Sequence, residues 1–325
     1  MLASVLSCAV ANADVSDYGS YDFVVDGIYY DILSEADNEC AVSDPDASHL
    51  YSGEIVIPEQ VEYNGTTYTV TAIGDGAFTS CNVTGVSMPN TVTAIGMSAF
   101  QYSAITGIEL PSSLETIGEV AFNNCPALTS VTIPNSVTRI DMGAFSGCLS
   151  LREVVIGNSL TTISNNTFML CLALETVTIG SSVTEIGSNA FMNCSTIKTI
   201  NSLNPTPPSI TGSYVFADKV YSAATLNVPV GASAAYHDAA VWQNFDNIKE
   251  STLSGITAVN TQSRPVIEAA DGRITIKGAD GRVAIYDVSG TLVNSTEARG
   301  DVEIAVPDGN IYIVKTPSLT VKVAM

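Results

Sequence analysis

The chain has 325 residues, of which 46% are hydrophobic and only 14% are charged, and its formal net charge is −21 at pH 7. This composition excludes a disordered, charge-rich chain and leaves enough apolar residues for a large buried core. The negative charge also argues against nucleic acid as a partner, because nucleic-acid affinity depends on Lys and Arg contacts with phosphates. The length suits two or three domains.

Positive charge is missing from the first part of the chain, since no Lys or Arg precedes Arg139. Two interpretations stay open. Net charge away from zero keeps proteins apart in solution, and we favour this interpretation because the acidic residues are scattered and form no metal-ligand pattern. The alternative is an acidic surface that attracts cations or basic partners.

The first residues predict export. A short apolar segment ends in the small-residue pattern Ala11-Asn12-Ala13, as a secretory signal and its cleavage site do. We therefore assign residues 1–13 to a signal peptide, truncated because no positive residue precedes its apolar part. The expected location is secreted or the outer cell surface, and the alternative is lipidation at Cys8. No later segment has the roughly 18–20 apolar residues that a transmembrane helix needs.

An internal repeat occupies the middle of the chain. Its most visible member is a Phe that recurs at intervals of 22, 22, 23, 23 and 23 residues. An Ile precedes each Phe by five residues, and an apolar triplet such as Leu128-x-x-Val131-x-Ile133-Pro134 follows it. The repeated phenylalanines are Phe78, Phe100, Phe122, Phe145, Phe168 and Phe191.

The apolar triplet predicts a strand with two different faces. Val131 and Ile133 point one way, while Ser130 and Thr132 point the other. One such strand cannot bury its apolar side alone, but equivalent strands stacked about 4.8 Å apart bury all of them together. The second short apolar run, at residues 137–140 in this repeat, predicts a strand on the opposite wall.

The cysteines favour a buried ladder over disulfides or a metal site. Five of them occupy one repeat position, and Ser103 takes the sixth. A small, weakly polar residue repeated in register fits a packed interior better than a redox or metal framework does. The five are Cys81, Cys125, Cys148, Cys171 and Cys194.

The repeat closely resembles the BspA-type leucine-rich repeat of bacterial cell-surface proteins. The Ile-Gly, Ala-Phe, Cys and L-x-x-V-x-I-Pro positions carry the resemblance, which covers about residues 21–250. It implies a mainly β leucine-rich-repeat solenoid of about six to seven repeats with terminal caps. The N-terminal cap and a first irregular repeat, with a hairpin turn at Asn64-Gly65, are expected at residues 14–72. The regular repeats are expected at residues 73–200.

Residues 201–250 predict a degenerate repeat followed by a helical cap. Phe216 falls 25 residues after Phe191. Between Ala232 and Ile248, aromatic residues recur at roughly helical spacing, and we interpret this segment as a terminal helix that packs Trp242 over the open end. The alternative is that Trp242, the only Trp, stacks on a sugar.

The last part of the chain has a different pattern. Residues 251–264 are polar and are interpreted as a linker. Residues 265–325 contain short alternating strands, such as Arg273–Lys277 and Val283–Asp287, with Gly and Asp between them. This pattern predicts a small β-sandwich.

The same stretch resembles the C-terminal sorting domain of type IX secretion. The matching segments are residues 285–290, 308–315 and 321–323, while Asn310 departs from the family pattern. The resemblance implies export across the outer membrane and attachment or release there. The alternative is a plain accessory β-domain.

No motif of catalysis is present in the sequence. His49 and His237 have no Cys or Ser at a spacing known for nucleophilic catalysis, and the metalloprotease, nucleophile-elbow and phosphate-loop motifs are absent. We therefore expect no enzymatic activity, no metal and no cofactor.

The outward positions of the main strands predict a binding surface on the concave face of the solenoid. Small hydroxyl residues dominate there, together with Glu. The alternative is that Thr merely suits strands and keeps them soluble. The candidate residues are Ser87, Glu109, Ser130, Thr132, Glu153, Thr176 and Thr178.

Together these features predict a monomeric, non-catalytic protein for adhesion to, or recognition of, host matrix or bacterial surface proteins. Two alternatives stay open. One is a glycan-binding or nutrient-capture module of the envelope, which exposed aromatic residues on one face would favour. The other is an enzyme with a site between the solenoid and the C-terminal domain, which a deep pocket holding two acids would favour.

Overall fold

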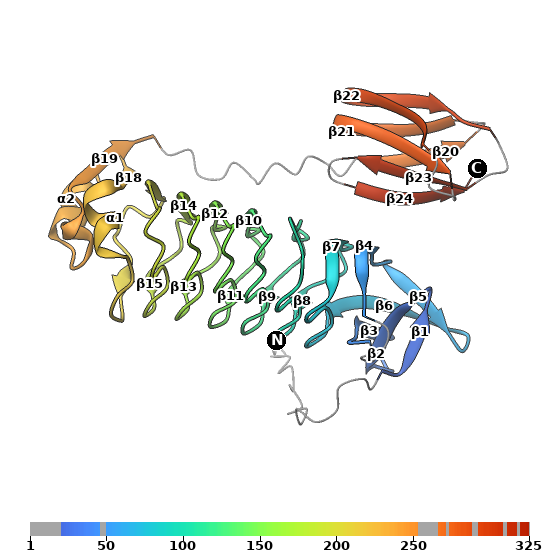
Figure 1. The fold of residues 1–325 in the computed structure, drawn as a ribbon, viewed down its shortest axis with the longest axis horizontal. Helices are drawn as coiled ribbons and strands as arrows, with labels where there is room; N and C mark the ends of the chain where they lie inside the picture. Colours follow the sequence, from blue (N-terminus) through green and yellow to red (C-terminus); the bar gives the residue numbers. More distant parts are fainter. Residues whose placement is uncertain are drawn as a thin grey trace, which may run out of the picture.

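The structure is a computed structural model. It describes residues 21–45, 50–252, 266–270, 273–287, 292–307, 311–316 and 319–324. The predicted signal peptide, Cys8, His49 and most of the predicted linker lie outside these residues. From the N-terminal strands to residue 252, the chain winds into a β-solenoid whose coils stack along one axis (Figure 1).

The main wall of the solenoid is built from parallel strands, one from each coil. Six of them form a continuous sheet, and two earlier ones form a separate pair. The sheet contains β10 (Ser130–Thr132), β12 (Glu153–Val155), β14 (Thr176–Ile179), β16 (Thr199–Ser202), β18 (Thr225–Pro229) and β19 (Asn247–Ser251). The pair contains β4 (Ser52–Val56) and β7 (Asn82–Ser87).

The opposite wall is built from the second apolar run of each repeat, as predicted. Its strands are two residues long and parallel, and each ends in an Ile that is buried, except the half-buried Ile210 of the last strand. In chain order they are β8 (Ala94–Ile95), β9 (Thr116–Ile117), β11 (Arg139–Ile140), β13 (Thr162–Ile163), β15 (Glu185–Ile186) and β17 (Ser209–Ile210).

The repeated phenylalanines form one stacked column between the two walls. Consecutive ring centroids from Phe78 to Phe216 lie between 4.9 and 5.5 Å apart, with nearly parallel planes. Tyr51 closes the column at its first end and Trp242 at its last. Phe216 thus extends the column by one coil beyond Phe191.

The cysteine ladder is also present. All six cysteines of the described part are buried and free of disulfides. The thiols of Cys125, Cys148, Cys171 and Cys194 each donate to the carbonyl oxygen of the Phe in the preceding coil, at 3.0 to 3.3 Å. These thiols thus act as buried hydrogen-bond donors between coils, because each satisfies a backbone carbonyl.

The N-terminal cap is a set of strands that continues the opposite wall. Antiparallel strands precede the first coil, and the predicted Asn64-Gly65 turn joins β5 to β6 with both residues at positive φ. The strands are β1 (Phe23–Val25), β2 (Ile28–Ser34), β3 (Glu39–Val42), β5 (Gln60–Tyr63) and β6 (Thr66–Ile73). β6 then pairs with β8, so the cap and the coils share one sheet.

The C-terminal cap buries Trp242 as predicted, but the long terminal helix is wrong. Only Ser233–Asp238 is α-helical (α2), after a short helix α1 (Asp218–Ala223). Trp242 begins a 3-10 turn (Trp242–Asn244), and Ile248 lies on β19, which extends the main sheet. The apolar spacing correctly identified side chains that face the open end. It did not identify their secondary structure, since they lie on a helix, a 3-10 turn and a strand.

The strand expected in the second regular coil is missing from the structure. Residues 105–110 match the repeat pattern, yet they form no strand between β7 and β10. Ile108 and Leu110 are only half-buried, whereas the equivalent Val131 and Ile133 of the next coil are buried. The main wall is therefore interrupted at this coil.

The interruption coincides with a change in coil length. Five positions separate Phe100 from Ile105, and six separate Phe122 from Leu128. The extra residue shifts the path of the chain just before β10, and neighbouring parallel strands pair only when their registers match. All later coils keep the longer spacing, and their strands pair continuously.

The C-terminal region forms a five-stranded antiparallel sheet with its own apolar core around Ile274, Ile285 and Val314. The predicted short strands Arg273–Lys277 and Val283–Asp287 are two halves of one long strand, β21, with a register shift between them. The Gly and Asp cluster thus marks this irregularity and not a turn. The two-sheet arrangement of a sandwich stays a prediction. The strands are β20 (Val266–Ala270), β21 (Arg273–Asp287), β22 (Leu292–Ala305), β23 (Ile311–Thr316) and β24 (Leu319–Ala324).

Candidate binding surface

The outward side chains of β10, β12, β14, β16 and β18 form regular columns, which we call the main-strand face. Ser130, Glu153 and Thr176 occupy neighbouring rungs of one column, because the three strands pair in register. They alternate with buried Val residues, and Ser130 and Glu153 are exposed. Strand pairing therefore holds these three predicted residues side by side.

A second column runs parallel to the first. Thr132 and Thr178 belong to it, with Val155 between them. The column continues into two residues that the sequence analysis did not select: the amide of Asn201 donates to Thr178 Oγ1 at 3.2 Å, and the amide of Asn227 donates to Asn201 Oδ1 at 2.9 Å. The signal was available, since Thr-x-Asn twice replaces Thr-x-Thr at the same repeat position.

Two of the predicted residues lie apart from this array. Ser87 is the last residue of β7, which pairs with β4 and not with β10. Glu109 lies in the interrupted coil, where no strand forms. The structure thus brings together five of the seven candidates, while Glu109 lies within the interruption and Ser87 lies beyond it.

A row of charged residues borders the main-strand face. Glu175 lies between Lys198, at 2.9 Å, and Arg152, at 3.7 Å. The hydrogen bond from the Lys198 ammonium is the largest cause that lowers the pKa of the Glu175 carboxyl below its ordinary value, and the Arg152 charge adds to it. Because these groups are well exposed, the row contributes little to stability, but it gives this border alternating charge.

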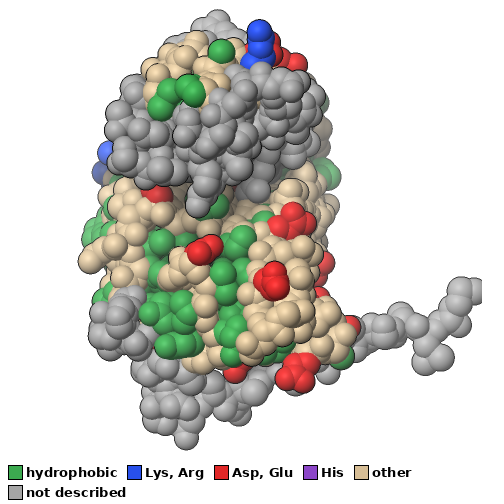
Figure 2. All heavy atoms as spheres, turned by 90° about the vertical axis from the view of Figure 1, so that its right-hand side faces the viewer, with side chains coloured by type: hydrophobic (Ala, Val, Ile, Leu, Met, Phe, Trp, Pro, Cys, Tyr) green, Lys and Arg blue, Asp and Glu red, His purple; other side chains and the backbone are tan. Residues whose placement is uncertain are grey.

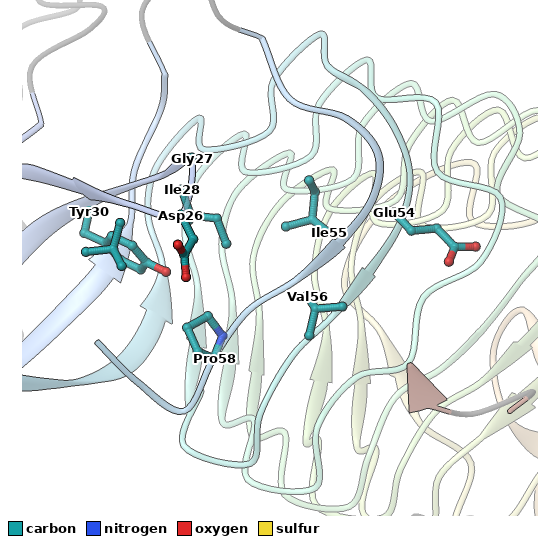
Figure 3. A pocket seen from close by; sticks show the side chains of 9 residues that line it. Asp26, Gly27, Ile28, Tyr30, Glu54, Ile55, Val56 and Pro58 are labelled. Atoms are coloured by element: carbon teal, nitrogen blue, oxygen red, sulfur yellow. The ribbon is translucent and has the colours of Figure 1, made fainter. Parts of the chain in front are cut away.

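The N-terminal end carries a pocket that sequence reasoning missed. It lies between the turn that joins β1 to β2 and the strand β4, and its volume is about 310 Å³. Figure 3 shows Asp26, Ile28 and Tyr30 on one side and Ile55 and Val56 on the other. Asp26-Gly27 was readable as a hairpin turn, but its packing against β4 had no local signal.

Within the described part of the chain, no group of three or more His, Cys, Asp or Glu side chains is arranged to hold a metal ion. The same residues contain no helix with the length and apolar character needed to cross a bilayer.

Stacked parallel coils, inward apolar columns and an outward polar face define the class as a leucine-rich-repeat solenoid protein. A family model, the BspA type leucine-rich repeat region, matches residues 71–198 and 162–261 with six copies. The two matches together span more than half of the sequence, and the chain belongs to the BspA-type leucine-rich repeat family. Membership of this family suggests a protein-binding or recognition role, and the family is not known for catalysis.

Solved structures of bacterial proteins share the fold. A leucine-rich cell surface protein from Faecalibacterium prausnitzii is 24% identical with a TM-score of 0.50, covering 66% of this chain and 72% of its own. The T. pallidum leucine-rich repeat protein is 24% identical with a TM-score of 0.50, and the match covers 56% of this chain and 86% of the T. pallidum chain. A Bacteroides ovatus leucine-rich repeat protein is 26% identical with a TM-score of 0.44, and the match covers 71% of this chain and 68% of the B. ovatus chain. No curated protein matches the chain.

Proposed function

We propose that the chain is a non-catalytic recognition protein that binds a surface protein of a host or bacterial cell through its main-strand face. The observation that carries this proposal is the array of Ser130, Glu153 and Thr176 on strands in register. A rigid sheet presents such side chains without the entropy cost of ordering a loop. Five strands at a spacing of about 4.8 Å give a surface of the order of 20 Å in length, which suits a protein partner.

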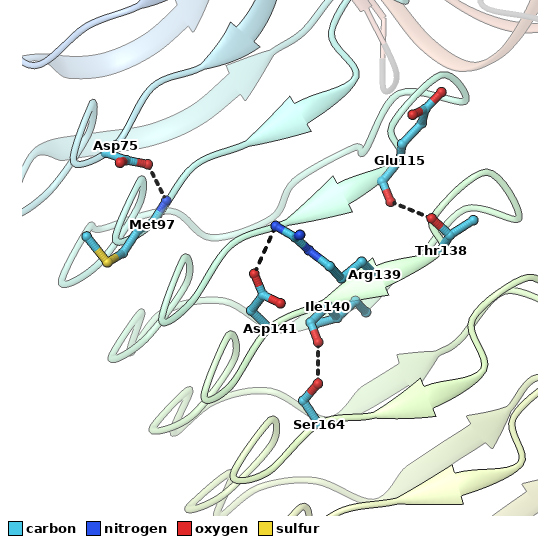
Figure 4. A network of polar contacts seen from close by, with 8 residues as sticks. All are labelled: Asp75, Met97, Glu115, Thr138, Arg139, Ile140, Asp141 and Ser164. Carbon is cyan, nitrogen blue, oxygen red and sulfur yellow. Dashed lines mark hydrogen bonds and ion pairs between the residues drawn. The ribbon is translucent and has the colours of Figure 1, made fainter. Parts of the chain in front are cut away.

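The opposite wall supplies a control surface on the same scaffold. Figure 4 shows that its polar groups bond to one another: Ser164 donates to the carbonyl oxygen of Ile140 at 2.6 Å, and Arg139 pairs with Asp141 at 3.3 Å. Thr138 and Thr184 are exposed on this wall. Substitutions here change the charge of the protein without touching the main-strand face.

The test uses the full chain against immobilised host matrix proteins, bacterial surface proteins and glycans. The double variant Ser130→Lys/Thr176→Lys should weaken binding to a protein hit by at least about tenfold, because each 1.4 kcal/mol corresponds to a factor of ten. The charge-matched control Thr138→Lys/Thr184→Lys should bind within about twofold of the parent. Equal losses in both variants, or no protein hit in the panel, would contradict the proposal.

Location and domain organisation complete the proposal. One similar solved structure that is named a cell surface protein and the apolar segment at residues 1–13 support secretion to the outer surface. The C-terminal sheet would then be the sorting domain, from about residue 265. Mass spectrometry of the exported protein should find a mature N-terminus at Asp14, and an unprocessed N-terminus in the exported fraction would contradict the signal-peptide assignment.

The glycan-binding alternative has less support. Sugar recognition commonly stacks a sugar on an exposed aromatic ring, and the strongly exposed Tyr102 and Tyr214 lie in turns outside the main-strand face. Trp242 is buried in the C-terminal cap. The glycan arm of the same panel tests this alternative.

A further inference from the structure

We infer that the pocket at the N-terminal end is a second binding site, and that it takes the alkylammonium side chain of a lysine presented by a partner protein. None of the residues that line it belongs to the strands β10, β12, β14, β16 and β18 of the main-strand face. The site therefore goes beyond the proposed function.

The walls of the pocket suit the carbon stem of a lysine. Ile28, Ile55, Val56 and Pro58 line it together with the turn between β1 and β2. Val56 is 45% exposed, although it is a large apolar residue on a strand. Four methylene groups between such walls would remove apolar surface from water, which favours binding.

An unsatisfied hydroxyl marks the polar end of the pocket. Tyr30 is 0% exposed, and among the described residues its hydroxyl oxygen has no hydrogen-bond partner. The neighbouring Tyr51 is satisfied, because its hydroxyl accepts from the backbone N–H of Tyr29 and donates to the carbonyl oxygen of Ser43. A buried polar group without a partner destabilises the fold and therefore calls for an explanation.

Asp26 supplies a negative charge beside this hydroxyl. Figure 3 shows the Tyr30 hydroxyl pointing toward the Asp26 carboxylate. Burial, with smaller effects of Cys40 and Asp26, raises the pKa of Tyr30 above its ordinary value, so the phenol keeps its proton. An ammonium group carries three donors, and it could donate to the carboxylate and to the phenol oxygen at once.

The position of Asp26 is fixed by its turn. Asp26 and Gly27 have φ of 49° and 79° and join the antiparallel strands β1 and β2, as in a type I′ hairpin. Asn tolerates the same left-handed conformation, so Asp26→Asn removes the charge while it keeps the turn.

The charge of this end favours a cation over a neutral or anionic ligand. No Lys or Arg occurs before Arg139, so the N-terminal cap has acidic side chains and no Lys or Arg among them. Figure 2, which faces this end, shows hydrophobic side chains gathered in the middle with acidic side chains around and between them. Such a field attracts cations.

The strand β4 indicates a protein as the source of the lysine. Among the described strands, β4 pairs only with β7, and its residues Glu54, Ile55 and Val56 line the pocket. An extended segment could add to this edge by backbone hydrogen bonds while it places one side chain in the pocket, as in other cases of strand addition. A basic partner would also complement the acidic end.

The test titrates the full chain with Nα-acetyl-lysine N-methylamide and with the norleucine analogue, which has the same stem without the charge. The lysine probe should bind, and the norleucine probe should bind at least about tenfold more weakly, because a hydrogen bond to a charged group is stronger than a neutral one. Asp26→Asn should lose about tenfold in affinity for the lysine probe. Tyr30→Phe should lose affinity as well, while Glu119→Gln, an exposed acid on another coil, should not.

The proposed lysine site would be contradicted by any of three results: equal affinity for the two probes, unchanged affinity of Asp26→Asn for the lysine probe, or no binding of the lysine probe. If Asp26→Asn fails to fold, Tyr30→Phe still tests the site, provided that its melting temperature is not below that of the parent. An extended Thr-Lys-Thr peptide should bind more tightly than butylammonium, and equal affinities would overturn the protein source. Ser130→Lys/Thr176→Lys should leave lysine binding unchanged, which separates this site from the proposed function of the main-strand face.

Discussion

The two ends of the solenoid both close the Phe column with aromatic side chains, but they differ in how they satisfy polar groups. At the C-terminal end, Trp242 Nε1 donates to the carbonyl oxygen of Pro208 at 2.7 Å, and the Tyr236 hydroxyl donates to that of Asn204 at 2.7 Å. At the N-terminal end, the buried Tyr30 hydroxyl has no partner among the described residues.

This difference separates a structural cap from a candidate site. A cap need only cover the last apolar coil and satisfy its own polar atoms, and the C-terminal end does both. The N-terminal end covers the first coil but keeps a pocket beside an unsatisfied hydroxyl and a carboxylate. Similar aromatic packing can thus serve stability at one end and recognition at the other.

The largest loss of stability is expected for a substitution in the Phe column, because the column connects the two ends. Phe145 lies fully buried in the middle of the column, and Phe145→Ala should leave a cavity and lower the free energy of unfolding by about 3–5 kcal/mol. Chemical denaturation measures it, with the exposed Leu149→Ala as control. An unchanged unfolding midpoint for Phe145→Ala would show that the ring is not stacked inside.

The tyrosines at the two ends give a matched pair. Tyr236→Phe should lower the free energy of unfolding by about 1–2 kcal/mol, because Ser202 and the Asn204 carbonyl lose a buried partner. Tyr30→Phe should not lower it and should raise it by up to about 1 kcal/mol, because the variant no longer buries a hydroxyl that bonds to nothing in the described part. Equal losses in both variants, measured by denaturant unfolding, would remove the distinction between the ends.

The smallest effect concerns the acidity of the N-terminal end. Burial, with the nearby Asp31 charge, raises the pKa of Asp44 to about 6. The folded state therefore binds the proton more tightly than the unfolded state does, and wild-type stability falls as pH rises from about 4 through 6. Asp44→Asn should melt at a higher temperature than the parent at pH 7.5.

The same comparison has an internal check at low pH. Below about pH 3 Asp44 is protonated in both the folded and the unfolded state, because its ordinary pKa is 3.8, so the two melting temperatures should converge. Glu119→Gln, which removes a charge from a middle coil, controls for the change in net charge. A melting difference for Asp44→Asn that does not change with pH would contradict the raised pKa.

Much of the solenoid could be predicted from the sequence because each coil repeats the same packing problem. The Phe spacing, the cysteine position and the Asn64-Gly65 turn each have a local physical cause, and the structure contains all three. The interruption at residues 105–110 was not predicted, because that coil keeps the full apolar pattern; the sequence signal that accompanies it is the extra residue before β10.

The sites show the same limit. The column of Ser130, Glu153 and Thr176 follows from period-two alternation and strand register, both readable locally. The pocket joins Asp26 and Tyr30 to a strand more than twenty residues later, and only the packing of the cap brings them together. The predicted helix to Ile248 failed for a related reason, since apolar spacing reports which side chains are buried and not the backbone that carries them.

The difference between the ends can be measured in one sample labelled with ¹³C at the ζ position of tyrosine, with signals assigned from Tyr30→Phe and Tyr236→Phe. On titration with Nα-acetyl-lysine N-methylamide, the Tyr30 signal should shift and saturate, while the Tyr236 signal stays in place. A Tyr30 signal that does not move, or that moves equally with the norleucine analogue, would contradict an open ligand site at the N-terminal end.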